Sequence, residues 1–190
     1  MLRTFLALEL PVSVREAIIL SQRKFQAQLP AASWTRPQAL HVTLKFLGET
    51  PEDLIEILKL SVGETLKKIS PFSVDLEGVG VFPTNQAPRI LWVGVSTGKS
   101  GLQNLATEVE KAVLPFGFPL EKKPFHPHVT LARIKKNYTE FGQKLKQMQI
   151  LQDSFKFGSI IVHSITLFRS ELQPTGSIYT PLWELHFQQI

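Results

Sequence analysis

The stretch HVTL at residues 41–44 returns unchanged at residues 128–131, so the two copies lie 87 residues apart. That separation is far longer than the unit of a solenoid repeat and approaches half of the 190-residue chain. Each copy falls in a short apolar run that is typical of a β-strand. The recurrence therefore predicts one domain over residues 1–190 with two related, intertwined halves, approximately residues 1–82 and 88–190.

Apolar periodicity and turn residues predict the same order of elements in both halves. Each half reads strand, helix, strand, helix, strand, and the second half adds one further strand. The expected strands lie at residues 3–10, 40–46, 72–81, 89–95, 128–134, 159–168 and 178–187, and the expected helices at 11–29, 50–68, 102–115 and 138–148. Thr50 and Pro51 predict the cap and first turn of the second helix.

Side chains alternate between the two faces of a strand, so His41 and Thr43 share a face that Val42 does not. The same alternation places His128 and Thr130 together. If the halves pair about a pseudo-two-fold axis, two imidazoles and two hydroxyls line one cleft. That set suits a phosphodiester, because hydroxyls donate to phosphate oxygens while one imidazole accepts a proton and the other donates one. The ordinary imidazole pKa of about 6.5 allows both forms near neutral pH.

Composition narrows the class of protein. Hydrophobic residues make up 43% of the chain and charged residues 19%, which excludes wholesale disorder. The chain has no cysteine, which excludes a disulfide scaffold, a thiolate zinc site and a cysteine nucleophile. A net charge of +5 suits an anionic partner. No stretch approaches the roughly 20 apolar residues of a membrane helix, so we expect a soluble cytoplasmic protein with no membrane partner.

A metal site is the main chemical alternative, because His126 and His128 share one strand face. Residues 121–136 carry five cations and one acid, and no third histidine or carboxylate stands beside the pair. A cationic neighbourhood repels a metal ion and attracts a phosphate, so we expect no metal and no cofactor. His163 and His186 have no matching partner and stay outside the predicted site.

The chain resembles the two-histidine phosphoesterase superfamily, whose mark is a pair of His-x-Thr-x motifs in a duplicated fold. It is similar in particular to the RNA 2′,3′-cyclic phosphodiesterase branch, historically called 2′-5′ RNA ligases. The resemblance covers nearly the whole chain. It is carried by RTFLALELP at residues 3–11, HVTLKFLG at 41–48, PRILW at 88–92, FHPHVTLAR at 125–133, and the tail from 170–172 to Tyr179.

The resemblance implies a bilobal α+β fold with two antiparallel sheets facing a central cleft, helices on the outside and pseudo-two-fold symmetry. It also implies metal-independent hydrolysis of an RNA 2′,3′-cyclic phosphate end. His128 would activate water as the proton acceptor, and His41 would protonate the leaving 3′ oxygen as the proton donor, giving a 2′-phosphomonoester. Thr43 and Thr130 would hold the phosphate oxygens. In reverse, with a 5′ hydroxyl in place of water, the site would form a 2′-5′ RNA bond.

Further residues are candidates for binding the substrate. By the resemblance Arg133 binds phosphate, although strict alternation puts it opposite His128 unless the strand ends or bulges first. Parity puts Lys45 on the face of His41, near the phosphate. Arg89, beside the seam at residues 82–88, is a candidate contact for the RNA backbone. The aromatic candidates for stacking on a base, with core packing as the competing role, are Trp34, Phe125 and Tyr179.

Two other functions stay open at this point. A related two-histidine esterase would act on a small nucleotide, either a 2′-5′ oligonucleotide or ADP-ribose 1″,2″-cyclic phosphate. A non-catalytic module would hold RNA ends in a basic cleft without cleaving them. We expect a monomer whose partner is RNA with a 2′,3′-cyclic phosphate end or a similar nucleotide.

Overall fold

The computed structural model describes residues 1–30, 32–173 and 176–188. Within them the helices are α1 (Val12–Gln26), α2 (Leu54–Leu66), α3 (Lys99–Val113) and α4 (Tyr138–Gln147), with the 3-10 turns η1 (Pro37–Ala39) and η2 (Leu114–Phe116). The strands are β1 (Leu2–Glu9), β2 (Ser33–Trp34), β3 (His41–Thr50), β4 (Phe72–Phe82), β5 (Ile90–Val95), β6 (Val129–Arg133), β7 (Lys156–Val162), β8 (Ser164–Gln173) and β9 (Gly176–His186). The strand pairings are antiparallel, which confirms the predicted α+β class.

The strands form one nine-stranded sheet, in which two sets of strands meet at the repeated motif. One set, the His41 sheet, has the order β3-β1-β8-β9, and the other, the His128 sheet, has the order β7-β4-β5-β6 with β2 added to β6. Val42 of β3 pairs with Val129 of β6 where the two sets meet. The second residues of the two tetrapeptides are therefore direct neighbours, and each sheet takes strands from both halves of the sequence.

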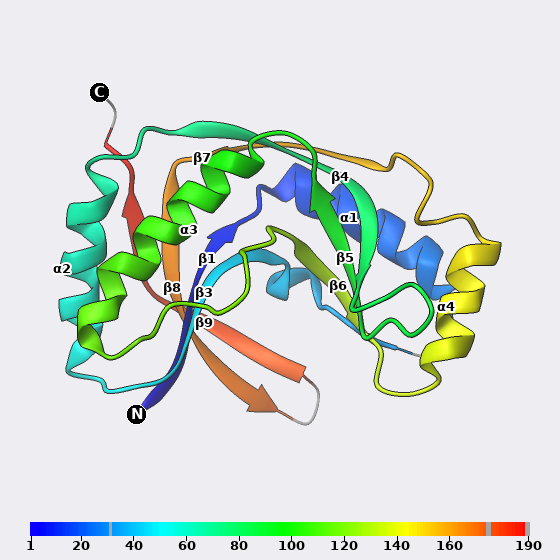
Figure 1. Cartoon of the computed structure of the whole chain (residues 1–190), viewed down its shortest axis with the longest axis horizontal. Helices are drawn as coiled ribbons and strands as arrows, with labels where there is room; N and C mark the ends of the chain where they lie inside the picture. The colour runs from blue at the N-terminus through cyan, green and yellow to red at the C-terminus, as the bar shows by residue number, and fades with distance from the viewer. Residues whose placement is uncertain (31, 174–175, 189–190) are drawn as a thin grey trace.

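The helices lie on the outside of the strands (Figure 1). α3 packs on β3 and α2 packs on β9, whereas α1 packs on β7 of the His128 sheet. Leu102, Leu105 and Val109 recur at helical spacing on α3 and are fully buried, which holds that helix against β3. No helix in the described residues is both long enough and apolar enough to cross a membrane.

Both motif strands contain a β-bulge at the last residue of the tetrapeptide. In β3, consecutive residues of β1 pair with Thr43 and Lys45, so the pairing skips Leu44. In β6, the pairing with β5 skips Leu131 in the same way. A bulge restarts the alternation of side chains one residue late, so the residues that follow change face.

The bulges decide which side chains follow the histidines into the cleft. Lys45 and Ala132, each directly after a skipped leucine, are buried on the core side. The residues one position further, Phe46 and Arg133, line the same cavity as the motif histidines. A β-bulge at the same position therefore has the same effect in both copies of the motif.

The predicted strand over residues 159–168 is wrong, because the structure has two strands there. β7 pairs with β4 and β8 pairs with β1, so the chain passes from the His128 sheet to the His41 sheet at His163. Both strands are apolar, and periodicity does not mark a change of partner.

The predicted helix cap at Thr50 is also wrong. Thr50 is the last residue of β3 and is fully buried, with its hydroxyl 2.7 Å from the hydroxyl of Thr4. The same hydroxyl donates to the carbonyl oxygen of Gly48 at 3.2 Å. Helix α2 instead begins at Leu54 after Asp53, without a side-chain cap. The Thr50 hydroxyl is satisfied inside the sheet and is therefore unavailable to the helix.

Candidate active site

Both tetrapeptides open onto one cavity of about 660 Å³. β3 contributes His41 and Thr43, and the second copy contributes His128 and Thr130. The four side chains share the cavity because β3 and β6 pair at the middle of the two motifs. That antiparallel register places His41 across from Thr130 and Thr43 across from His128, which is a pseudo-two-fold arrangement.

The orientation of His41 follows from two hydrogen bonds. Its Nδ1 lies 2.8 Å from the carbonyl oxygen of Ala39, and its Nε2 lies 3.0 Å from the hydroxyl of Thr43. A carbonyl oxygen only accepts, so Nδ1 carries the hydrogen and donates it. In the neutral ring, Nε2 then accepts from the Thr43 hydroxyl and is the atom available for proton transfer.

His128 is held in the same way. Its Nδ1 lies 2.7 Å from the carbonyl oxygen of His126, again two residues earlier in the chain. Nδ1 therefore carries the hydrogen here too, and the neutral ring has its lone pair on Nε2. The duplication thus reproduces the tautomer and the tether as well as the residue type.

Aromatic rings surround both imidazoles. The ring centroid of His41 lies 4.9 Å from that of Phe5 and 5.3 Å from that of Tyr179. The ring centroid of His128 lies 5.3 Å from that of Phe82. These rings reduce the contact of the imidazoles with water, and loss of water disfavours a charged ring.

Both histidines accordingly favour the neutral form. Burial lowers the pKa of His41 to about 4, against an opposing contribution from the hydrogen bond to Ala39. Burial also lowers the pKa of His128. The positive charge of Arg133 lowers both pKa values further. Near pH 7, each ring therefore has an unprotonated Nε2.

Arg133 and Tyr179 are the predicted binding residues that line the cavity. Strict alternation would put Arg133 opposite His128 unless the strand ended or bulged first. The strand does bulge at Leu131, and Arg133 therefore lies on the face of His128. Tyr179, on β9, forms T-shaped ring contacts with His41 and with Phe5. Of the residues predicted to bind substrate, a guanidinium and a phenol therefore line the cavity of the two imidazoles.

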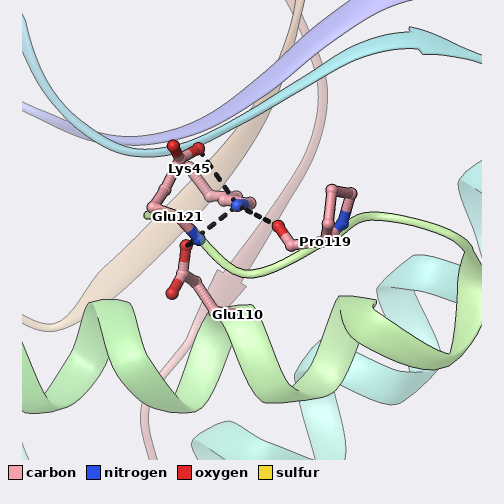
Figure 2. A network of polar contacts seen from close by, with 4 residues as sticks. All are labelled: Lys45, Glu110, Pro119 and Glu121. Carbon is pink, nitrogen blue, oxygen red and sulfur yellow. Dashed lines mark hydrogen bonds and ion pairs between the residues drawn. The ribbon is translucent and has the colours of Figure 1, made fainter. Parts of the chain in front are cut away.

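The predicted position of Lys45 near the phosphate is wrong. The bulge at Leu44 turns it to the core side, where it is 3% exposed. Its ammonium lies 2.8 Å from Glu110 Oε1 and 3.1 Å from Glu121 Oε1 (Figure 2). It also donates to the carbonyl oxygen of Pro119 at 2.6 Å. Lys45 therefore ties β3 to α3 and to the loop that precedes the second motif.

Phe125, Arg89 and Trp34 are not among the residues that line the cavity, and their contacts with the substrate stay predictions. Phe125 packs half-buried against the core. The guanidinium carbon of the exposed Arg89 lies 5.4 Å from the ring centroid of Tyr138 on α4. Trp34 lies in β2, pairs with β6 and packs against the core. Each of the three has a structural partner away from the histidines.

Several cavity residues were not predicted. Arg3 and Phe5 come from β1, the neighbour of β3, and Phe46 comes from β3 after its bulge. Phe82 enters from the end of β4. Alternation along residues 3–5 shows that Arg3 and Phe5 share a face. It does not show which strand lies beside β3, so the sequence alone did not connect them with His41.

The cavity offers imidazoles, hydroxyls and the guanidinium groups of Arg3 and Arg133, without a carboxylate among its lining side chains. In the part of the chain that the structure describes, no group of three or more histidine or acidic side chains is placed to hold a metal ion. The ring centroid of His126 is 6.4 Å from that of His128, and the carbonyl oxygen of His126 is what contacts the neighbouring ring.

The sequence matches the family model of the 2′-5′ RNA ligase superfamily over residues 13–174, a range that includes both tetrapeptides. It is 40% identical over 159 residues to the RNA 2′,3′-cyclic phosphodiesterase of Aquifex aeolicus, covering 80% of each chain. It is 30% identical over 182 residues to the RNA 2′,3′-cyclic phosphodiesterase of Methanothermobacter thermautotrophicus, covering 95% of this chain and 96% of the relative.

Solved structures share the fold as well. A crystal structure of a Thermus thermophilus protein is 32% identical, with a TM-score of 0.79 and 97% of each chain covered. The crystal structure of E. coli LigT in its apo form is 27% identical, with a TM-score of 0.77, covering 99% of this chain and 98% of LigT. LigT has also been crystallised with 3′-AMP. The similarity therefore spans the strands and helices that build the cavity.

Proposed function

The chain belongs to the 2′-5′ RNA ligase superfamily, and we propose that it hydrolyses RNA 2′,3′-cyclic phosphodiester ends to 2′-phosphomonoesters. The observation that carries this proposal is one cavity in which His41 and His128 each donate from Nδ1 to a carbonyl oxygen. Two Nε2 atoms are thereby left for proton transfer, which is what a matched acid and base require. The relatives named RNA 2′,3′-cyclic phosphodiesterase support the same chemistry.

In the proposed reaction, His128 Nε2 takes a proton from water while the water oxygen attacks the cyclic phosphorus. The bond between phosphorus and the 3′ oxygen breaks, and His41 Nε2–H protonates that oxygen. The phosphate remains on the 2′ oxygen. Turnover leaves His128 protonated and His41 neutral, and exchange with solvent restores both. No metal or other cofactor takes part, and the assignment of donor and acceptor follows the superfamily resemblance.

The low pKa of His41 makes its proton dependent on the substrate. Burial holds the pKa of His41 to about 4, so the ring is neutral before substrate binds. A phosphodiester brings one negative charge beside the imidazole, and an opposite charge nearby favours the protonated ring. Binding therefore raises the pKa of His41 and favours the protonated donor in the complex.

The remaining polar groups of the cavity position the phosphate. Thr43 and Thr130 would donate to its non-bridging oxygens, and the Thr43 hydroxyl is already 3.0 Å from His41 Nε2. Arg133 would balance the charge that develops on phosphorus oxygens during attack. The cavity would thus bind the transition state more tightly than the ground state of the substrate.

Phosphorus NMR of a short cyclic-phosphate RNA, incubated with the protein and EDTA, tests the proposal. We expect the cyclic signal to be replaced by that of a 2′-monoester. A 3′-monoester, or turnover that needs added zinc, would contradict it. RNA that stays intact but bound, equally tightly after both histidines become alanine, would identify an RNA-end-binding module instead.

Three finer points belong to the same proposal. Ligation of a 5′ hydroxyl end through a 2′-5′ bond is the reverse reaction at the same site.

A panel containing a 2′-5′ oligonucleotide and ADP-ribose 1″,2″-cyclic phosphate decides whether RNA is the preferred substrate. We also propose a monomeric enzyme of the cytoplasm. A chain without cysteine fits a reducing compartment, and light scattering measures the oligomeric state.

A further inference from the structure

The buried face of α1 includes a polar side chain. The residues of this face are Val14, Ile18, Gln22 and Phe25, which recur at helical spacing, and Gln22 is 4% exposed. Burial of a carboxamide costs free energy unless its polar atoms are hydrogen-bonded, and an apolar residue would fit this face without that cost. The hydrogen bonds of Gln22 therefore point to a role beyond packing.

The Gln22 carboxamide bonds to two backbone carbonyl groups at the edge of the catalytic cavity. Its Nε2 donates to the carbonyl oxygen of Thr35 at 2.8 Å and to that of Leu131 at 3.0 Å. The amide nitrogen has two hydrogens, so one side chain can make both bonds. Thr35 itself lines the cavity, and its backbone N–H also donates to the Leu131 oxygen, at 2.8 Å. Gln22 thus joins α1 to β6 and to the segment after β2.

Leu131 is the residue that the pairing of β6 with β5 skips. The extra residue of a bulge is left unpaired in its ladder, so bonds from outside that ladder decide how firmly it is held. Gln22 and Thr35 supply two such bonds. The conformation of the bulge therefore depends on the buried glutamine of α1.

The guanidinium of Arg133 depends on this bulge for its position. Arg133 is exposed, and within the described residues its side chain has no hydrogen-bond or ion-pair partner. It follows Leu131 by two residues, and the bulge places it on the face of His128. A change in the bulge would displace the guanidinium, because no side-chain contact holds it in the cavity.

We propose that Gln22 is a positioning residue for catalysis, because its carboxamide fixes the bulge at Leu131 and thereby holds Arg133 in the cavity. The inference rests on the proposed function for the role of Arg133 at the phosphate. Gln22 is not among the residues that line the cavity, so it acts through Arg133. In β3 the buried Lys45, directly after the bulge, is tied to α3 in a comparable way.

Gln22→Met tests the inference, because it removes both donors and keeps a side chain that suits the buried face. It is expected to lower kcat/KM for a cyclic-phosphate RNA by about 10-fold to 10²-fold, since a displacement of roughly 1 Å can cost that much. NMR titration should give a higher pKa for both His41 and His128, because Arg133 lowers both. A glutamine with a purely structural role would leave both pKa values unchanged.

A double variant separates positioning from an independent effect. Gln22→Met/Arg133→Met is expected to have the kcat/KM and the histidine pKa values of Arg133→Met alone, because the group that Gln22 positions is already absent. Losses of kcat/KM that multiply in the double variant overturn the inference and leave the proposed function intact.

Ser61→Ala is the matched control. The Ser61 hydroxyl donates to the carbonyl oxygen of Ala112 at 2.8 Å and ties α2 to α3, and neither residue lines the cavity. Loss of this bond should lower the free energy of unfolding without changing kcat/KM or the pKa of either histidine. Gln22→Met that behaves in the same way overturns the inference.

Gln22→Asn takes the place of Gln22→Met if circular dichroism shows that the latter does not fold. It keeps the two donors on a side chain one methylene shorter, so kcat/KM and both pKa values should change in the same directions by less. Wild-type protein that does not hydrolyse cyclic-phosphate RNA contradicts the proposed function instead. The histidine titrations then test the position of Arg133 by themselves, and unchanged pKa values in the variant that folds overturn the inference.

Discussion

In β3 the motif ends in a bulge at Leu44 and then presents Phe46 to the cavity, whereas in β6 it ends in a bulge at Leu131 and then presents Arg133. Up to the bulge the two copies are equivalent in sequence, in strand register and in the tether of Nδ1 to a carbonyl oxygen. Beyond the bulge they differ in charge and shape. The duplication thus provides two equivalent groups for proton transfer, and the residues that follow make the two sides of the cavity unequal.

Both sides of the cavity nevertheless carry a cation and an aromatic ring. Arg133 and Phe82 lie on the His128 side, whereas Arg3, Phe5 and Phe46 lie on the His41 side. The two sides therefore differ in which strand supplies the charge and the ring. The buried position directly after each bulge also differs, since it is Lys45 in one copy and Ala132 in the other.

The largest expected effect tests the equivalence of the two copies. His41→Ala and His128→Ala should each lower kcat/KM by about 10²–10⁴-fold, because each removes one proton-transfer group. His163→Ala, an exposed histidine outside the cavity, serves as the control in the same phosphodiesterase assay. Activity that survives either cavity substitution would show that the copies are not equivalent in catalysis.

The next largest effect tests the difference between the residues that follow the two bulges. Arg133→Met should lower kcat/KM by about 10²-fold, because a charge that stabilises the phosphorane-like transition state is lost. It should also raise the pKa of both His41 and His128, since Arg133 lowers both. NMR titration of the imidazole signals measures this change. Arg23→Met, at an exposed arginine of α1 outside the cavity, should leave the activity and both pKa values unchanged.

The third prediction concerns Lys45, the buried residue after the bulge in β3, and its contribution to the free energy of unfolding. Lys45→Met should lower the free energy of unfolding by about 2–3 kcal/mol, because Glu110 loses its cation in a buried setting. Urea denaturation measures the loss. Lys67→Met, which removes an exposed pair with Glu64, should cost less than about 1 kcal/mol. Lost activity at undiminished stability would place Lys45 at the substrate after all.

The smallest effect is a pH dependence of stability. The pKa of His41 falls from 6.5 to about 4 on folding, so the unfolded chain binds more protons between these values. The free energy of unfolding should therefore decrease as the pH falls, by about 1 kcal/mol between pH 7 and 5.5 for this residue. His41→Gln should flatten the curve measured by thermal or urea unfolding over that range. A curve identical to that of the wild type would contradict the burial of a neutral ring.

The bulges explain why some binding residues could be placed from the sequence and others could not. Strict alternation put Lys45 with His41, and the same rule put Arg133 opposite His128 unless the strand bulged. The structure has a bulge at the equivalent leucine in both strands, so one placement failed and the other succeeded for the same reason. A bulge depends on pairing with a neighbouring strand, and a sequence read one strand at a time carries no mark of it.

Local pattern determined most of the elements but not their partners. The helical spacing of apolar residues predicted α1, α3 and α4 closely, because each buries one face. The apolar spacing did not predict the change of strand partner at His163 or the short strand β2. Both depend on which strands lie side by side. Thr50 looked like a cap for the same reason, as its partner Thr4 is 46 residues away.

The repeated HVTL by itself determined the residue types of the site and their common face within each strand, because alternation is a property of the local backbone. Only the tertiary structure decided that Val42 pairs with Val129, which gathers both copies on one cavity. It likewise decided that Phe46 and Arg133, rather than Lys45, complete that cavity. Strand partners and bulges arise from contacts between segments far apart in the chain, and such contacts leave no local periodicity.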